Sequence, residues 1–470
     1  MSAESAEEGE TMLVDLLKSL NWFILCYLIV ISFGYIILLI ASVRDVFLRF
    51  QEIRLGDVLS MMKSEMMPSV TVLIAAYNEE KNVTESVYSA LKSTYTNTFV
   101  TVINDGSTDN TLKVLMDTFA LEQQPMTIPQ LIKDTGKLKT YYVSKTYPNL
   151  VVIDKEHVDK SDSLNVGVNA CRTPLFMTVD ADTLLEPDAV SEVVFYMLTK
   201  PHAVAVGGAA YIINSCKYKD GVMLETKMPY KLIPALQACE YLRSFVINRA
   251  GWNYLGGSLS FSGAFTLFEH KAVVDIGGFD VGNPANDFEI ITHLHAYKLK
   301  TDAPYQIGFT PAATAWTDVP ATLKEYWHQR TNWQKGTLRS LLLHKQMFFN
   351  PRYRLVGLFG YPFFLLAETF GALVECTAYL TVILSWALGI IHWYTAVLFF
   401  IVCWLFVTSL TMATGFISFL TYDKYHRLRD LPWLLFVVTL ESFGFRQFHM
   451  ICRVLATFRY FIFGDGKKKK

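Results

Sequence analysis

The fold of this chain is decided by an apolar run that ends in two acids one residue apart, Met177-Thr178-Val179-Asp180-Ala181-Asp182-Thr183. Residues i and i+2 of a strand point to the same side, so both carboxylates can face one ion. Carboxylates placed in this way hold a divalent cation against phosphate oxygens. A solvated turn after an edge strand has the same pattern, so the surrounding sequence has to decide between the two interpretations.

Strands and helices alternate from residue 69 up to this segment. Short apolar runs predict buried strands at 70–74, 99–103, 150–153 and 175–179. Apolar residues at helical spacing predict helices between them, marked by Val83, Val87 and Leu91, by Leu112, Leu115 and Phe119, and by Leu164 and Val168. This α/β alternation implies a mostly parallel sheet with helices on both faces. Ligands of such sheets bind beyond the carboxyl ends of the strands.

Three of these strand ends are polar in a way that packing does not explain. They read Ala75-Ala76-Tyr77-Asn78-Glu79-Glu80, Asn104-Asp105-Gly106-Ser107-Thr108-Asp109-Asn110-Thr111, and the Asp180/Asp182 pair. Each alone could be an ordinary helix cap or turn. Together at one sheet edge they offer acceptors for a base and ribose, a helix N-terminus and a metal site, which suits a nucleoside diphosphate. Neither a P-loop motif nor a G-x-G-x-x-G after the first strand is present, so those two nucleotide folds are not supported.

The composition indicates a membrane protein. Of the 470 residues, 52% are hydrophobic and 14% aromatic, which is high for a soluble enzyme. The run 22–41 is about long enough to cross a bilayer, and its acidic leader lacks the basic front of a cleavable signal peptide. Arg44, Arg49, Arg54 and Lys63 follow it, so the positive-inside rule places residue 50 onward in the cytoplasm. The seven cysteines show no C-x-x-C spacing and suggest neither zinc nor a disulfide framework.

The C-terminal region 351–466 contains further apolar segments. We expect an interfacial helix that Pro362 breaks, a crossing at about 364–390 and a second at 397–419. Glu368 and Glu375 inside the first of these suggest a polar path, a partner, or pairing within the bundle. Residues 431–463 are expected to form a hairpin or interfacial helices, and the basic tail Lys467–Lys470 should remain inside.

Seven motifs in order resemble those of the membrane-bound family 2 glycosyltransferases of the GT-A fold, a group that includes cellulose, chitin, hyaluronan and poly-N-acetylglucosamine synthases. They are Tyr77-Asn78-Glu79, Asn104-Asp105-Gly106-Ser107, Lys160-Ser161-Asp162-Ser163-Leu164-Asn165, Asp180-Ala181-Asp182, Ser262-Gly263-Ala264, Asn286-Asp287 and Gln329-Arg330-Thr331-Asn332-Trp333. The resemblance covers roughly residues 68–336 and the hydrophobic C-terminal arrangement. It implies an inverting hexosyltransferase that uses a UDP-sugar with Mg2+ or Mn2+ and extends a β-linked polysaccharide or oligosaccharide, with export through the membrane as a further step.

The resemblance also implies roles for individual residues. Asp105 would contact the uracil, and Asp182 would bind the metal. Asp180 would act beside the nucleotide and donor sugar, and Asp287 would be the general base that takes the acceptor's proton. The other residues expected to bind substrate are Ala76, Asn78, Glu80, Lys160, Gly263, Gln329, Arg330 and Trp333.

Two positions depart from the family pattern. Asn286 stands where the family has a glutamate before the base, and Asn332 replaces the arginine of Q-x-x-R-W. Asparagine brings no charge to a donor diphosphate, whereas guanidinium grips phosphate with a planar fork. Arg330 or Lys335 could supply a cation, although residues 330 and 332 face different sides of a helix. These departures leave two alternatives open, glycosylation of a lipid acceptor and a catalytically weak, nucleotide-binding subunit of a synthase.

The resulting domain organisation places a GT-A domain between membrane helices. The expected segments are an acidic leader 1–18, a transmembrane helix 19–43, a cytosolic linker 44–68, the GT-A domain 69–318, an interfacial acceptor helix 319–350, the membrane region 351–466 and the tail 467–470. We expect a multi-pass protein of the inner or plasma membrane with its catalytic domain in the cytosol. The expected partners are the bilayer, another copy of the chain or an export protein, and no nucleic acid.

Overall fold

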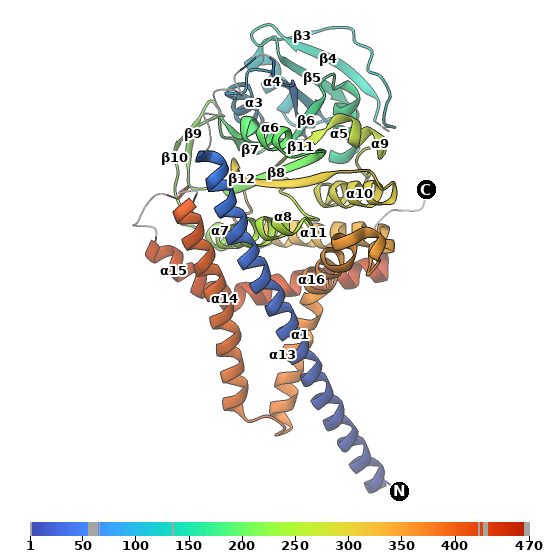
Figure 1. Cartoon of the computed structure of the whole chain (residues 1–470), viewed down its shortest axis with the longest axis vertical. Helices are drawn as coiled ribbons and strands as arrows, with labels where there is room; N and C mark the ends of the chain where they lie inside the picture. Colours follow the sequence, from blue (N-terminus) through green and yellow to red (C-terminus); the bar gives the residue numbers. More distant parts are fainter. Residues whose placement is uncertain are drawn as a thin grey trace.

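The computed structural model describes residues 2–54, 64, 66–133, 136–421, 424–425 and 431–464. An α/β domain lies above a layer of helices, and long helices run away from that layer on the other side (Figure 1). The basic tail 467–470, Lys63 and residues 55–63 of the expected linker lie outside the described residues.

One ten-stranded sheet forms the centre of the α/β domain, in the order β3-β4-β5-β2-β1-β6-β11-β8-β12-β7. A separate hairpin pairs β9 with β10. The strands are β1 Val70–Ala76, β2 Thr98–Asn104, β3 Leu121–Gln123, β4 Leu138–Ser144, β5 Leu150–Lys155, β6 Leu175–Asp180, β7 Thr183–Leu185, β8 Ala203–Ile212, β9 Lys217–Lys219, β10 Val222–Glu225, β11 Phe265–Glu269 and β12 Gln306–Thr317.

The four strands expected from the apolar runs form the parallel half of this sheet. Strand β1 pairs in parallel with β2 and β6, and β2 pairs in parallel with β5. Consecutive residues Val72, Leu73 and Ile74 are all fully buried, so both faces of β1 are covered, as in other buried parallel strands. The register places Ala76 beside Asn104 and Ala75 beside Asp180, which brings the three polar strand ends to one edge.

The prediction of a mostly parallel sheet is wrong for the other half. Strand β11 lies between β6 and β8 and runs antiparallel to both, and β7 runs antiparallel to β12. The chain leaves the sheet after β8 and forms the β9–β10 hairpin and a helical excursion before β11, so it can return in either direction. The antiparallel pairs also include β3 with β4 and β4 with β5, whereas β8 and β12 pair in parallel, so the parallel prediction holds for β1, β2, β5 and β6 and again for β8 with β12.

The three helices predicted from the apolar spacing are present as α3, α4 and α5 of the α/β domain. Helix α5 begins where Asp159 caps it by accepting a hydrogen bond from the Asp162 N–H at 2.8 Å. The domain's helices are α3 Val83–Leu91, α4 Thr111–Phe119, α5 Lys160–Ala170, α6 Ala189–Thr199, α9 His270–Asp275 and α10 Asn286–Lys300.

A layer of helices lies beneath the domain (Figure 1). It contains α7 Leu232–Arg243, which continues through a π-helical turn Ser244–Arg249 into α8 Ala250–Leu255, together with α11 Leu323–Leu343 and α16 Arg446–Phe463. The α7–α8 segment packs on α1 Ser2–Arg54, and Gly251 permits this, because a Cβ there would lie 2.5 Å from the Leu38 carbonyl oxygen. Sequence analysis did not identify this segment.

Within the described residues, two helices are long and apolar enough to cross a membrane, Thr11–Leu48 and Trp393–Ile417. The segments Val356–Thr369 and Gly371–Ala387 would make a third crossing if counted as one span, although they are bent by 44°. In Figure 1, α13 Gly371–Ala387 and α14 Trp393–Thr421 run side by side away from the domain, while α15 Leu431–Leu440 stays near the helix layer.

The expected break at Pro362 is wrong. Pro362 is the second residue of the short helix α12 Tyr361–Phe363, and π-helical turns lie on both sides of this helix, at Val356–Gly360 and Phe364–Thr369. Because proline is tolerated at the first turn of a helix, where its missing N–H is not needed, the chain stays helical there. The bend comes at Phe370 instead.

The two acids inside the apolar C-terminal region are paired within the protein. The Tyr35 hydroxyl donates to a Glu368 carboxylate oxygen at 2.7 Å. Arg446 Nε lies 2.8 Å from Glu375 Oε1. Of the alternatives for these acids, pairing within the bundle is therefore the one that the structure supports, and the pairs tie α13 and its preceding turn to α1 and α16.

Candidate functional site

Four acids gather where β1, β6 and β12 end. Asp182 follows β6, and its electrostatic neighbours include Asp180, Glu79 and Asp318. Burial raises the pKa of Asp182 to about 7, and the negative charges of these neighbours add to the effect. Lys160 opposes it, but one ammonium leaves an excess of negative charge in the group.

This carboxylate group fits a divalent cation. Asp180 and Asp182 supply the oxygen ligands that Mg2+ and Mn2+ prefer. Burial is the main cause of the raised pKa of Asp182, and the carboxylates around it outnumber the one ammonium of Lys160. A bound cation would balance this excess of negative charge.

Lys160 is the first residue of α5, and its Nζ forms an ion pair with Asp180 Oδ1. Burial disfavours the charged amine, but the neighbouring carboxylate of Asp180 outweighs burial and raises the pKa of Lys160. The ammonium therefore stays charged beside the strand end at which a diphosphate would sit.

Asp105 is held by a buried charge network. Its Oδ1 accepts from Lys155 Nζ at 2.5 Å and from the Val158 N–H at 3.1 Å, and its Oδ2 lies 2.7 Å from His157 Nδ1. Lys155 is fully buried between Asp105 and Asp162, with Nζ 2.9 Å from the Asp162 carboxylate. Lys155 and His157 were not predicted as site residues, because no sequence motif marks a lysine that is buried at the end of a strand.

The side chains of Asn78 and Glu80 hold the loop that leads into α4. Asn78 has φ 57° and its Oδ1 accepts from the Thr108 N–H at 2.8 Å. Glu80 Oε2 accepts from the N–H and the side-chain amide of Asn110, both at 3.0 Å. Ala76 is buried, and its carbonyl accepts from the Asp105 N–H at 2.9 Å. These three residues shape the edge of the sheet through contacts with the backbone.

Tyr77 presents an aromatic face at the same edge. Its ring is 42% exposed and stacks on His157, with ring centroids 4.0 Å apart and planes 16° from parallel. An exposed ring beside a strand end is a surface on which a nucleobase can stack.

Asp287 lies in the first turn of α10, and Lys160 is one of its electrostatic neighbours. Burial raises the pKa of its carboxyl, with Lys160 and Arg249 opposing the rise and Asp180 adding to it. A Cβ at Gly263 would be 3.2 Å from Asp287 Oδ2, so the loop before β11 lies against this carboxylate. Ala285 is the N-cap of α10, so Asp287 does not cap this helix.

Arg249 is a further cation near Asp287 that sequence analysis missed. Burial lowers its pKa to about 10, and Asp287 is the neighbour that most opposes this change. One guanidinium nitrogen donates to the Phe261 carbonyl at 3.0 Å, while the buried Nε has no partner. Arg249 therefore braces the loop that carries Gly263.

Helix α11 presents the Gln329–Trp333 motif, and its residues separate into two faces. Arg330 is buried, forms an ion pair with Glu240 at 2.5 Å, and lies over the Trp333 ring at 4.4 Å. Asn332 is exposed and Trp333 is 39% exposed. Arg330 thus bonds Glu240 through one nitrogen and lies over Trp333, while its buried Nε and Nη2 have no hydrogen-bond partner among the described residues. Gln329 and Lys335 are half-buried.

Taken together, the polar strand edge, the acid cluster and Asp287 on α10 form the candidate site of a GT-A glycosyltransferase. The chain belongs to the family 2 glycosyltransferases. The description "Glycosyl transferase family 2" matches residues 71–237, and "Glycosyl transferase family group 2" matches residues 175–412.

The relatives are polysaccharide synthases. The poly-β-1,6-N-acetyl-D-glucosamine synthase of Staphylococcus aureus strain COL is 26% identical over 277 residues, which is 59% of this chain and 56% of that protein. The Staphylococcus epidermidis enzyme of the same name is 26% identical over 60% of this chain and 58% of its own length. The match thus spans little more than half of these relatives. The mannosyltransferase PcManGT from Pyrobaculum calidifontis, in complex with GDP-Man and Mn2+, superposes with TM-score 0.49 at 16% identity, over 88% of this chain and 99% of that chain.

Proposed function

We propose that this chain transfers a hexose from a UDP-sugar, with inversion, to a growing β-linked polysaccharide or oligosaccharide at a membrane. The observation that carries this proposal is that Lys160 forms an ion pair with Asp180 at the strand edge and also has Asp287 of α10 as an electrostatic neighbour. The names of the relatives make UDP-N-acetylglucosamine the first donor to test.

The donor half of the proposal rests on the strand edge. Tyr77 and His157 offer a surface for the uracil, and the network of Asp105 fixes the backbone around it. Asp180 and Asp182 would hold Mg2+ or Mn2+, and the cation would neutralise charge on the leaving diphosphate. Lys160 adds a fixed positive charge to the same oxygens, where it stabilises the charge that develops as the bond to C1 breaks.

The acceptor half rests on Asp287. Its carboxylate takes the proton of the acceptor hydroxyl, whose oxygen forms the new bond to C1 on the face opposite the departing UDP. The sugar's configuration inverts because attack and departure occur on opposite faces. Burial keeps the pKa of Asp287 above its ordinary value, and this makes it a stronger base than an exposed aspartate.

The membrane arrangement completes the proposal. The half-exposed Trp333 on α11 would stack on the acceptor sugar, with Gln329 beside it and Arg330 fixing the ring from behind. The two candidate spans and the bent pair would anchor the enzyme in a multi-pass arrangement, with its α/β domain in the cytosol. The domain boundaries expected from the sequence form part of this proposal.

The decisive experiment tests which UDP-sugar is the donor. Purified chain with Mg2+ or Mn2+ is given UDP-glucose, UDP-N-acetylglucosamine and UDP-glucuronate in turn, and UDP release is measured. We expect turnover with one donor. If the folded enzyme releases no UDP from any of the three, the chain is a nucleotide-binding subunit or uses another donor.

A lipid acceptor is a second proposal, favoured by the small number of candidate spans in the described residues. Few crossings leave little wall for a polysaccharide channel. Radiolabelled sugar decides between the two: a ladder of chain lengths supports the polymer, and a single organic-soluble glycolipid supports the lipid acceptor.

A further inference from the structure

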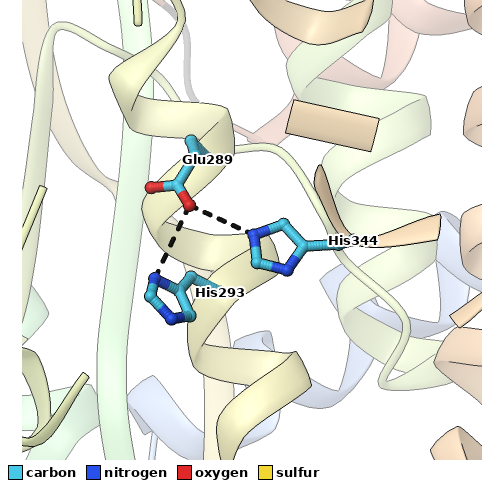
Figure 2. A group of neighbouring side chains, drawn as sticks. All are labelled: Glu289, His293 and His344. Atoms are coloured by element: carbon cyan, nitrogen blue, oxygen red, sulfur yellow. Dashed lines mark hydrogen bonds and ion pairs between the residues drawn. The ribbon is translucent and has the colours of Figure 1, made fainter. Parts of the chain in front are cut away.

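A buried carboxylate and two imidazoles meet between α10 and the end of α11. Figure 2 shows Glu289, His293 and His344 pointing toward one another, the first two from one helix. Glu289 Oε1 is 3.1 Å from His344 Nε2 and 3.6 Å from His293 Nδ1. The three ligand atoms all lie within 4.8 Å of one another.

The carboxylate of Glu289 lacks a permanent counter-charge. Its side chain is fully buried, and among the described residues the two imidazoles are its only basic partners within 4 Å. Its second oxygen, Oε2, is buried without a hydrogen-bond partner. A buried, half-satisfied carboxylate is costly unless a cation balances it.

We propose that Glu289, His293 and His344 bind one divalent transition-metal cation, with Zn2+ the best fit. Two imidazole nitrogens and one carboxylate form the three-ligand set that zinc accepts with a fourth position open. Zinc bonds of about 2.0–2.1 Å place tetrahedral ligands roughly 3.4 Å apart, and the two separations from Glu289 Oε1 lie on either side of that value. His293 is 33% exposed, so water or another ligand can complete the shell from that side.

This site differs from the Asp180/Asp182 group in its chemistry. Mg2+ prefers oxygen ligands, whereas imidazole nitrogens favour zinc, cobalt or nickel. The two sites should therefore bind different cations from one solution, and an excess of Mg2+ should leave the histidine site to Zn2+.

A cation here would tie together the two helices that carry the acceptor side of the reaction centre. Glu289 lies two residues after Asp287 on α10, and His344 directly follows α11, which carries Trp333. The helices already approach closely, because a Cβ at Gly336 would lie 2.5 Å from the Ala285 nitrogen. The metal would fix the base relative to the acceptor helix without touching substrate.

The test is calorimetric titration of chelator-treated full-length protein with Zn2+ in the presence of excess Mg2+. We expect one Zn2+ per chain, and at least a tenfold loss of affinity in His293→Gln and His344→Gln. The exposed His202→Gln serves as the matched control and should bind Zn2+ like the wild type. Asp182→Asn should also keep the histidine-site stoichiometry.

A second measurement keeps the test independent of variant folding. Co2+ in place of Zn2+ should give the visible absorption of four-coordinate cobalt with nitrogen ligands, and Zn2+ should raise the melting temperature of the wild type but not of His293→Gln. Because His293 is partly exposed, this variant should fold. The proposal is overturned if wild type binds no Zn2+ under excess Mg2+, or if both histidine variants bind it unchanged.

Discussion

The proposed donor edge, formed by the ends of β1, β2 and β6, and the proposed acceptor layer, formed by the helices α7, α8, α11 and α16, are built in different ways. The donor edge is made of neighbouring strand ends, where register alone brings Ala75 beside Asp180 and Ala76 beside Asn104. The acceptor layer is made of helices whose partners come from distant parts of the chain, such as Arg330 with Glu240 and Arg453 with Gln334. Local motifs therefore specify the donor edge, and long-range packing specifies the acceptor layer.

The largest expected effect separates chemistry from donor binding. In Asp287→Asn, the acceptor proton has no base, so kcat should fall by about 10²–10⁴, the range of general-base catalysis. UDP binding should stay within about threefold of wild type because Asp287 is on the acceptor side. Single-turnover rates and UDP titration measure the two quantities. Retained activity would show that another group takes the proton.

The second prediction tests whether Arg330 stabilises the fold or binds the donor diphosphate. Arg330→Met leaves Glu240 partly buried without its cation, and the free energy of unfolding should fall by about 3 kcal/mol, the low end for a buried pair because Glu240 stays 26% exposed. The melting temperature in detergent measures this. Lys335→Met, a half-buried cation of the same helix, is the control and should change stability little. A raised KM for the donor with unchanged stability would instead place Arg330 at the diphosphate.

The third prediction concerns the acid cluster and pH. An acid whose pKa is raised in the folded state costs stability as pH rises from its unfolded value, about 4, to its folded value, about 7 for Asp182. Mn2+ should reverse that loss. At 100 times its Kd, Mn2+ should add about 2.7 kcal/mol to the free energy of unfolding. At pH 6 Asp182 must lose a proton before Mn2+ binds, so Mn2+ binding should be about tenfold weaker than at pH 8.

Calorimetric titration at the two pH values measures the Mn2+ affinity. Asp182→Asn provides the control, since an amide cannot titrate and should abolish both the affinity and its pH dependence. Equal affinities at pH 6 and pH 8 in the wild type would show that Asp182 is not a ligand.

The same contrast explains how much of the structure could be predicted from the sequence. Strands β1, β2, β5 and β6 were predicted because each is a continuous apolar run, and the polar residues after them fall at one edge by topology. The α7–α8 segment, the antiparallel β11 and the brace of Arg249 were missed because their partners lie far along the chain. His293 and His344 are 51 positions apart, so only the spacing of Glu289 and His293 on one helix was visible in the sequence.

The fourth prediction asks whether the acceptor helix reaches the donor diphosphate. Asn332 is exposed on α11, so Asn332→Arg can be accommodated without disturbing the packing. If the diphosphate lies within reach, one charge-assisted contact of about 1.4 kcal/mol should lower KM for the UDP-sugar about tenfold. Asn332→Gln controls for side-chain length. An unchanged KM would show that Lys160 and the metal site hold the diphosphate without help from this helix.

The smallest expected effect concerns the connection between the two regions. Arg249 opposes the rise in the pKa of Asp287, so Arg249→Gln should raise that pKa further. The base works deprotonated, and the rate is lost as pH falls through its pKa, so the acidic limb of kcat/KM should move to higher pH. Arg249→Lys keeps the charge and should leave the limb in place, although it loses the fork that braces the Phe261 carbonyl. If both variants lower kcat equally at every pH, Arg249 acts only by holding the loop, and the helix layer controls the geometry of the base but not its charge.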